Sequence, residues 1–201
     1  MFNGKLRRHR VENLQAYWPG VEVDYLSILH VCPSYAFWLT QALLGLTSSG
    51  SRLLNSFYAV WVDLGFLPEE FDYGQWQQGK PPLNPSYPLR PELIESTYYQ
   101  YRATGDRSWL VAGTLFLESI ENNARTSCGY AAVADVSSME LDDVMPSFFL
   151  SETCKYLYLL FDEGNFVHSR DYIFSTEAHL FDPKQVCLNP SVPSDFLANL
   201  D

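Results

Sequence analysis

Hydrophobic residues recur every three to four positions along several segments of the chain, a spacing that predicts amphipathic helices. In Ser51–Leu64 the apolar side chains share one face, Ser51 is a suitable N-cap and Gly65 a suitable terminator. The same pattern predicts four further helices, at Leu6–Trp18, Leu89–Ala103, Ser108–Arg125 and Ser147–Leu160. Most of the chain is therefore expected to be helical.

The segments between these helices carry weaker signals. The run GYAAVADV (129–136) predicts a strand with its turn at 137–143, and a second short strand is expected at 172–174. Proline, glycine and glutamine are frequent over 68–88, which predicts a loop. Paired antiparallel helices with hairpins at one end predict an all-α architecture, and no short repeat indicates a solenoid.

Length and composition narrow the class of protein. A chain of 201 residues is expected to form one domain with a sizeable core. Aromatic residues make up 15%, which suits either a large core or a sugar-binding surface, the core being the more common use. A net charge of −11 argues against nucleic-acid binding, which depends on lysine and arginine.

A long stretch without charged residues, Tyr25–Ser51, raises the question of a membrane span. It exceeds the roughly 20 residues that a membrane helix needs, but Pro33 and the polar run at 47–50 argue against one. A buried helix, or a segment foreign to the surrounding fold, is the expectation. The basic first ten residues lack the apolar run of a secretory signal directly after them.

The four cysteines lack zinc-site spacing. Cys154 lies in an apolar helix and is expected to be a small buried hydrophobic residue. Cys128 and Cys187 could form a disulfide in an oxidising compartment, but spacing does not fix the pairing.

Carboxylates among apolar residues are the candidate chemistry. Glu92 and Glu95 share a helix face near its N-terminus, a position that also favours acidic residues for purely structural reasons. Glu152 lies among Phe148 and other apolar residues, where it could also simply pair with Lys155. Because a buried carboxylate is costly without a partner, a metal or a catalytic task, these positions predict one polar pocket.

Ordered sequence blocks resemble glycoside hydrolase family 47, the class I α-1,2-mannosidases. Four blocks carry the resemblance: LRPELIES (89–96), CGYAAV (128–133), MPSFFLSETCKYLYLLF (145–161) and YIFSTEAH (172–179). VENLQAYWPG (11–20), SRLLNSFYAVW (51–61) and LPEEFD (67–72) are also similar to the family. The sequence of residues 154–168 is most similar to the branch of ER degradation-enhancing α-mannosidase-like proteins.

The resemblance implies a fold and an activity. The fold would be an all-α, partial (α/α)7 barrel containing about the last three helical hairpins, over residues 1–183, with a loose tail at 184–201. The activity would be calcium-dependent, inverting removal of α-1,2-linked mannose from high-mannose N-glycans of misfolded glycoproteins. The implied location is the endoplasmic reticulum lumen, and a membrane span is not expected.

It also implies roles for individual residues. Glu92 matches the general base, and Thr176 matches the direct calcium ligand with Glu177 beside it. Four residues match positions that contact the terminal mannose or its hydroxyls: Arg90, Glu95, Phe148 and Glu152. Of these, Phe148 would lie beneath the sugar, and Glu152 would also hold calcium-bound water.

The chain departs from the family at two places. No acidic residue before Glu92 resembles the motif of the general acid. The sequence contexts of four of them are unrelated to that motif: Glu12, Glu22, Glu69 and Glu70. Residues 24–41 look inserted into a connection that is short in the family. We expect an unspliced or wrongly predicted segment there, and a true start other than Met1.

Three functions therefore remain open from the sequence. The first is an α-mannosidase, of which this chain is a catalytically incomplete part. The second is a non-catalytic module that binds calcium and mannose. The third is a helical interaction protein, which predicts that Glu92 and Glu152 are exposed.

Overall fold

A computed structural model describes residues 10–20, 46–169, 172–175 and 177–181. Its α-helices are α3 (Leu46–Leu64), α4 (Tyr73–Trp76), α5 (Glu92–Thr104), α6 (Ser108–Asn123) and α7 (Lys155–Phe161). The structure also contains two 3-10 helices, η1 (Asn13–Tyr17) and η3 (Phe166–Ser169), and a π-helix, η2 (Phe149–Cys154). The expected all-α architecture is confirmed.

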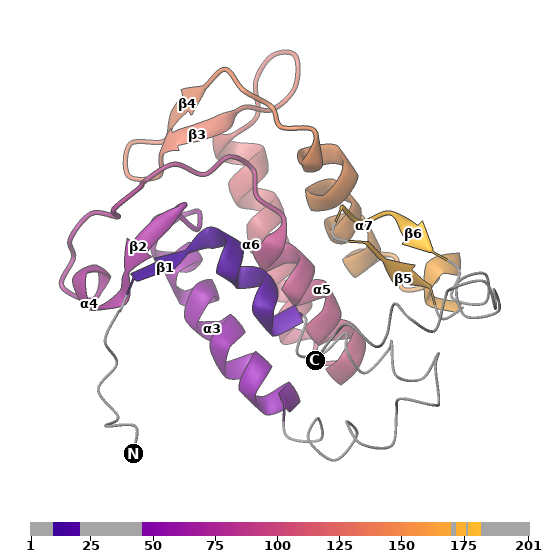
Figure 1. The fold of residues 1–201 in the computed structure, drawn as a ribbon. Coiled ribbons are helices and arrows are strands. Elements are labelled where there is room, and N and C mark those ends of the chain that lie inside the picture. The colour runs from indigo at the N-terminus through magenta and orange to yellow at the C-terminus, as the bar shows by residue number, and fades with distance from the viewer. Residues whose placement is uncertain (1–9, 21–45, 170–171, 176, 182–201) are drawn as a thin grey trace, which may run out of the picture.

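Helix α5 lies at the centre of the fold. It contacts η1, α3, α6, η2 and α7, and in the ribbon of Figure 1 it lies between α3 and α7. Its interior residues Leu93, Ile94 and Tyr98 are buried, and Gly105 ends it in a left-handed conformation with φ of 65°. The helix that carries Glu92 is therefore held on several sides.

A cluster of aromatic rings joins α3 to its neighbours. The ring of Trp61 contacts the rings of Phe66, Tyr87 and Phe116, with centroids 4.6 to 5.4 Å apart. All four side chains are almost fully buried. Much of the high aromatic content thus belongs to the core, as general burial habits predict.

The N-terminal prediction was wrong in part. Residues Arg10–Glu12 form strand β1, which pairs antiparallel with β2 (Glu70–Asp72). A helix over Leu6–Trp18 is therefore interrupted, and the region begins its helical turns only at Asn13; residues before 10 lie outside the described part. The predicted loop at 68–88 likewise contains β2 and α4.

Two further hairpins lie beyond α6. Strands β3 (Ala132–Asp135) and β4 (Glu140–Asp142) pair antiparallel, as do β5 (Ile173–Phe174) and β6 (Leu180–Phe181). The predicted strands at 129–136 and 172–174 are confirmed in shortened form, while β4 falls in the segment expected to be a turn.

The predicted helix at 147–160 is confirmed with one change. Its first part, Phe149–Cys154, is a π-helix, and only Lys155–Phe161 is α-helical. A π-helix has a wider turn than an α-helix and is frequent at functional sites. Side chains on both parts, including Phe149, Glu152, Tyr156 and Leu160, are buried.

Most of the uncharged stretch lies outside the described residues, as do Cys32, Cys187, the whole of the 24–41 insert and the 184–201 tail. In the described ranges no helix combines the length and apolar character needed to cross a membrane. Within the same ranges, Cys128 and Cys154 are free thiols, and Cys154 is half-buried against the core.

Candidate active site

The site begins at a tight backbone turn before α5. Leu89 is buried and has φ of 60°, a conformation that non-glycine residues rarely adopt. Two hydrogen bonds hold the turn: the Thr153 hydroxyl donates to the Leu89 carbonyl at 2.7 Å, and the Tyr87 hydroxyl donates to the Arg90 carbonyl at 3.0 Å. The strained turn thus connects η2 to the start of α5.

Arg90, the residue after Leu89, forms an ion pair that the sequence did not predict. Its Nε donates to Oε1 of Glu69 at 2.6 Å, and its Nη2 donates to Oε2 of the same carboxylate at 3.1 Å. The guanidinium carbon lies 5.5 Å from the centre of the Phe148 ring. The predicted residues Arg90 and Phe148 are therefore brought together, with Glu69 added.

Glu92, the predicted base, is 9% exposed on the first turn of α5. Its Oε1 lies 3.8 Å from Nη1 of Arg90, and its Oε2 is buried without a hydrogen-bond partner among the described residues. Burial raises the pKa of Glu92; a hydrogen bond to backbone and the charge of Arg90 partly offset this, while Glu69 adds to it. An available buried carboxylate oxygen of raised basicity suits proton abstraction.

Glu152 lies on the π-helix, and the residue is 6% exposed. Burial, followed by the nearby carboxylates of Glu177 and Glu92, raises its pKa to about 7, against a smaller opposite effect of Lys155. The alternative that Glu152 simply pairs with Lys155 is thus not what dominates its environment. The carboxylates of Glu92 and Glu177 thus both act electrostatically on Glu152.

Glu177 lies on the loop between β5 and β6, where it is exposed, and its carboxylate acts on Glu152. Lys155 Nζ donates to the carbonyl of Ala178 at 2.7 Å, which ties the loop to the start of α7. Ala178 is fully buried with φ of 54°. The predicted metal ligand Thr176 lies outside the described residues, so its role stays a prediction.

Glu95 lies one turn along α5 from Glu92 and is half-buried. It accepts a hydrogen bond of 3.0 Å from the hydroxyl of Tyr156 on α7. Burial, Tyr99 and Glu95 all raise the pKa of Tyr156, so this hydroxyl remains a donor. Glu95 is thereby oriented by α7.

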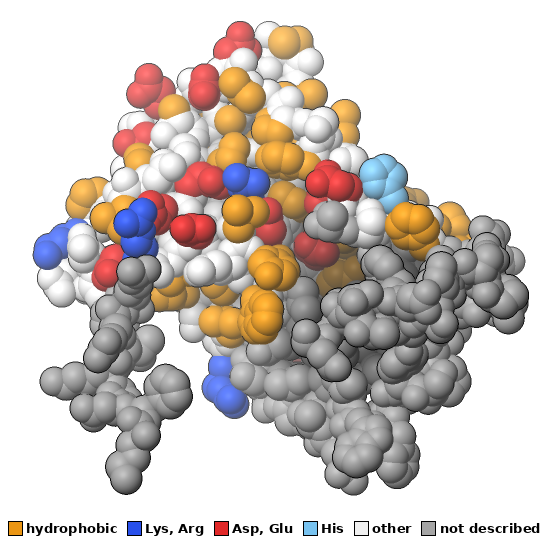
Figure 2. All heavy atoms as spheres, in the orientation of Figure 1, with side chains coloured by type: hydrophobic (Ala, Val, Ile, Leu, Met, Phe, Trp, Pro, Cys, Tyr) orange, Lys and Arg blue, Asp and Glu red, His pale blue; other side chains and the backbone are white. Residues whose placement is uncertain are grey.

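Charged side chains gather across the middle of the face shown in Figure 2, among hydrophobic atoms. Burial of Glu92 and Glu152 argues against the reading of this chain as an interaction protein with exposed acidic residues. Glu69 was missed because its sequence context matched no acid motif. One signal could have pointed to Glu69: a half-buried arginine such as Arg90 requires a carboxylate partner.

The donors present suit a hard cation. Carboxylate oxygens are the groups that calcium prefers, and the repulsion between Glu152 and Glu177 would be relieved by a positive charge. In the part of the chain that the structure describes, no three acidic, histidine or cysteine residues converge closely enough to form a metal centre by themselves.

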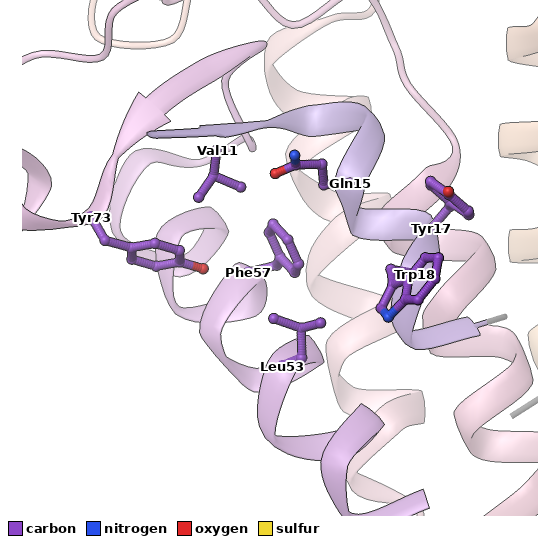
Figure 3. Close-up of a pocket in the computed structure, with 7 residues that line it drawn as sticks. All are labelled: Val11, Gln15, Tyr17, Trp18, Leu53, Phe57 and Tyr73. Carbon is purple, nitrogen blue, oxygen red and sulfur yellow. The ribbon is translucent and has the colours of Figure 1, made fainter. Parts of the chain in front are cut away.

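An apolar groove of about 380 Å³ lies apart from these residues, between the N-terminal segment and α3 (Figure 3). Its lining residues are Val11, Gln15, Tyr17, Trp18, Leu53, Phe57 and Tyr73. None of the predicted site residues lines it, so we assign it no part in the chemistry.

Paired carboxylates are the groups with which glycosidases act, and the helical fold and this site fit that class. The chain belongs to glycosyl hydrolase family 47, whose family model matches residues 3–183. The resemblance noted from the sequence blocks is thereby confirmed.

Similar proteins support the same assignment. ER degradation-enhancing alpha-mannosidase-like protein 2 of Homo sapiens is 38% identical over 202 residues, which cover 91% of this chain and 31% of that protein. Alpha-mannosidase I MNS5 of Arabidopsis thaliana is 40% identical over 179 residues, covering 89% and 27%. The chain therefore spans less than a third of the length of these relatives.

A solved structure confirms the fold. The alpha-1,2-mannosidase from Trichoderma reesei matches with a TM-score of 0.73 and 26% identity, covering 86% of this chain and 39% of that one. The helices described above accordingly correspond to part of the (α/α)7 barrel of this family.

Proposed function

We propose that this chain forms the base-bearing part of an α-1,2-mannosidase of the ER degradation-enhancing type. It would act on high-mannose N-glycans of misfolded glycoproteins in the endoplasmic reticulum lumen, with inversion and with calcium as cofactor. Membership of family 47 and the similarity to relatives of that name support this proposal.

The observation that carries the proposal is the state of Glu92. Its carboxylate is buried, its pKa is raised, and Oε2 has no hydrogen-bond partner among the described residues. A general base needs a carboxylate oxygen available for the proton of the attacking water. Arg90 and Phe148 beside it would position a sugar ring, the guanidinium by hydrogen bonds and the aromatic face by stacking.

The remaining predicted residues would bind the sugar and the cation. Glu95, oriented by Tyr156, would accept hydrogen bonds from sugar hydroxyls. Glu152 and Glu177 would orient water and hydroxyl groups around a calcium ion for which Thr176 is the proposed direct ligand. When bound, calcium would supply positive charge that keeps these carboxylates ionised and holds hydroxyl oxygens of the sugar.

Inverting hydrolysis also requires a general acid, roughly 6.5 to 9.5 Å from the base, to protonate the leaving oxygen. The near carboxylates of the described residues have other contacts: Glu69 pairs with Arg90, Glu95 binds Tyr156, and Glu152 interacts with Glu177. We expect the acid to come from the part of the family barrel that this chain does not cover. A calcium- and mannose-binding module without hydrolysis is the alternative that this observation favours.

Hydrolysis of the disaccharide Manα1-2Man distinguishes the two functions. We expect the native protein to release mannose as the β-anomer first, observed by proton NMR. Glu92→Gln should reduce turnover by about 100- to 10,000-fold, the usual contribution of a general base. The matched control is Glu140→Gln, which changes an exposed glutamate on β4.

Binding without hydrolysis in the native protein would replace the enzyme by the binding module. Full activity of the Glu92→Gln variant would refute the assignment of the base. Calcium is tested separately by titration calorimetry with CaCl₂, in which Thr176→Ala should weaken binding. An unchanged affinity of that variant would remove Thr176 as the ligand.

A further inference from the structure

The ion pair between Arg90 and Glu69 determines which carboxylate the arginine binds. Two of the guanidinium nitrogens donate to Glu69 at 2.6 and 3.1 Å, in the bidentate geometry that binds arginine most strongly. The third, Nη1, lies 3.8 Å from Oε1 of Glu92, which is too far for a hydrogen bond. Arg90 thus lies between two carboxylates and is bound to only one.

The backbone around Glu69 is fixed by long-range hydrogen bonds. Its N–H donates to the Ser86 carbonyl at 2.8 Å, and its carbonyl accepts from the N–H of Asn13 at 2.9 Å. The buried amide of Asn13 also donates to the Leu67 carbonyl at 2.6 Å. The carboxylate of Glu69 is therefore presented to Arg90 from a rigid segment at the start of β2.

Without Glu69, the guanidinium would have one close carboxylate left among the described residues, that of Glu92. Arg90 is only 22% exposed at its side chain, so an unpaired charge there would be costly. A small side-chain rotation would bring it into hydrogen-bond distance of Glu92, which is 3.8 Å away. A base held by an arginine in this way is less basic and presents fewer free oxygens to water.

We propose that Glu69 is a positioning residue that holds the Arg90 guanidinium away from Glu92 and so keeps Glu92 free to act as a base. The role of Glu92 as a base rests on the proposed function, whereas the position of the Arg90 guanidinium does not. Glu69 contacts Arg90, and its positioning effect on Glu92 passes through that arginine.

The charged and titratable groups around Glu92 come from several elements. Arg90 precedes it on the turn, Glu69 lies before β2, Glu152 lies on the π-helix, and Tyr87 lies before the turn. The charge of Glu69 raises the pKa of Glu92, and the charge of Arg90 lowers it. Loss of Glu69 therefore lowers the pKa of Glu92 even when Arg90 does not move. The experiment must separate that effect from a movement of Arg90.

A double-mutant cycle makes this separation. The pKa of Glu92 is measured by carboxyl NMR titration of the whole chain without calcium or sugar, in the wild type and in Glu69→Gln. The same change is then made in an Arg90→Gln background, where only the charge effect remains. Glu70→Gln is the matched control, because the neighbouring Glu70 pairs with Arg10 on β1 instead.

We expect Glu69→Gln to lower the pKa of Glu92 by at least about one unit more when Arg90 is present, since a close arginine lowers a carboxyl pKa by about 1 to 3 units. Equal falls in both backgrounds would overturn the proposal. If Glu69→Gln does not fold, Glu69→Asp decides, because it keeps the charge and shortens the arm. A fall in that variant supports positioning, and an unchanged pKa contradicts it.

Failure of the proposed function gives a different result. A protein that shows the predicted excess fall but never cleaves Manα1-2Man upholds the positioning of Arg90 and refutes the mannosidase proposal. Cleavage without the excess fall refutes the positioning and upholds the mannosidase.

Discussion

Replacement of Glu152 by glutamine should make the protein more stable at high pH and leave its stability almost unchanged at low pH. The pKa of Glu152 in the folded state is about 7, against an ordinary value of 4.5. Since the folded state binds this proton more tightly than the unfolded state does, stability falls as pH rises from the ordinary value to the folded one. Below that window both states are protonated and the effect vanishes.

The size of the effect follows from the difference between the two pKa values. One pKa unit corresponds to about 1.4 kcal/mol, so ionised Glu152 should cost about 3 kcal/mol above pH 7. Glutamine keeps the shape and carries no charge, and Glu152→Gln should therefore exceed the wild type in stability by about that amount at pH 8. At pH 4 the two should be nearly equal.

The assay is urea denaturation in calcium-free buffer at pH 4, 5, 6, 7 and 8, with Glu118→Gln, an exposed glutamate of α6, as the control. The difference between Glu152→Gln and wild type should grow between pH 5 and 7, and that of the control should not. A difference independent of pH would refute the reasoning. Repetition with CaCl₂ tests the cofactor, because a bound cation would stabilise the ionised wild type and reduce the advantage of glutamine.

Two further changes test how the site is held. Thr153→Val removes the buried hydrogen bond to the strained turn and should lower the free energy of unfolding by about 1 to 3 kcal/mol, while Thr114→Val, whose hydroxyl is exposed on α6, should change it by less than about 0.5 kcal/mol in urea denaturation. Equal effects of the two valines would contradict the role of the turn. Lys155→Met should remove the hydrogen bond to Ala178 and speed amide exchange over 177–181 about ten-fold or more, because a charged hydrogen bond contributes about 1.5 to 3 kcal/mol. Unchanged exchange would show that the loop is held by other contacts.

The central helices could be predicted because local signals and burial agree there. The periodic apolar residues of 51–64 lie on the buried face of α3, and Gly65 ends that helix as expected, in a left-handed conformation. The N-terminal segment was mispredicted because Arg10–Glu12 pairs with residues about sixty positions away. Such a pairing overrides local periodicity and leaves no local signal.

The site was predictable in its residue types and less so in its contacts. The sequence blocks pointed to Arg90, Glu92 and Glu152, and the structure brings these together. The partner of Arg90 was missed because Glu69 lies 21 positions earlier, on a different element. The π-helix at 149–154 was also missed, since a wider turn depends on packing around Glu152 and not on the pattern of apolar residues.

The two flanks of the connection between η1 and α3 are both fastened to α5. The N–H of Gly20 donates to the Ser96 hydroxyl at 2.9 Å, and the Ser51 hydroxyl donates to the Gln100 side chain at 3.3 Å, one turn further along. Closing a loop costs only about 0.6 kcal/mol more for each doubling of its length. Sequences of very different length could therefore be accepted between these two anchors during evolution without moving α5 or the glutamates that it carries.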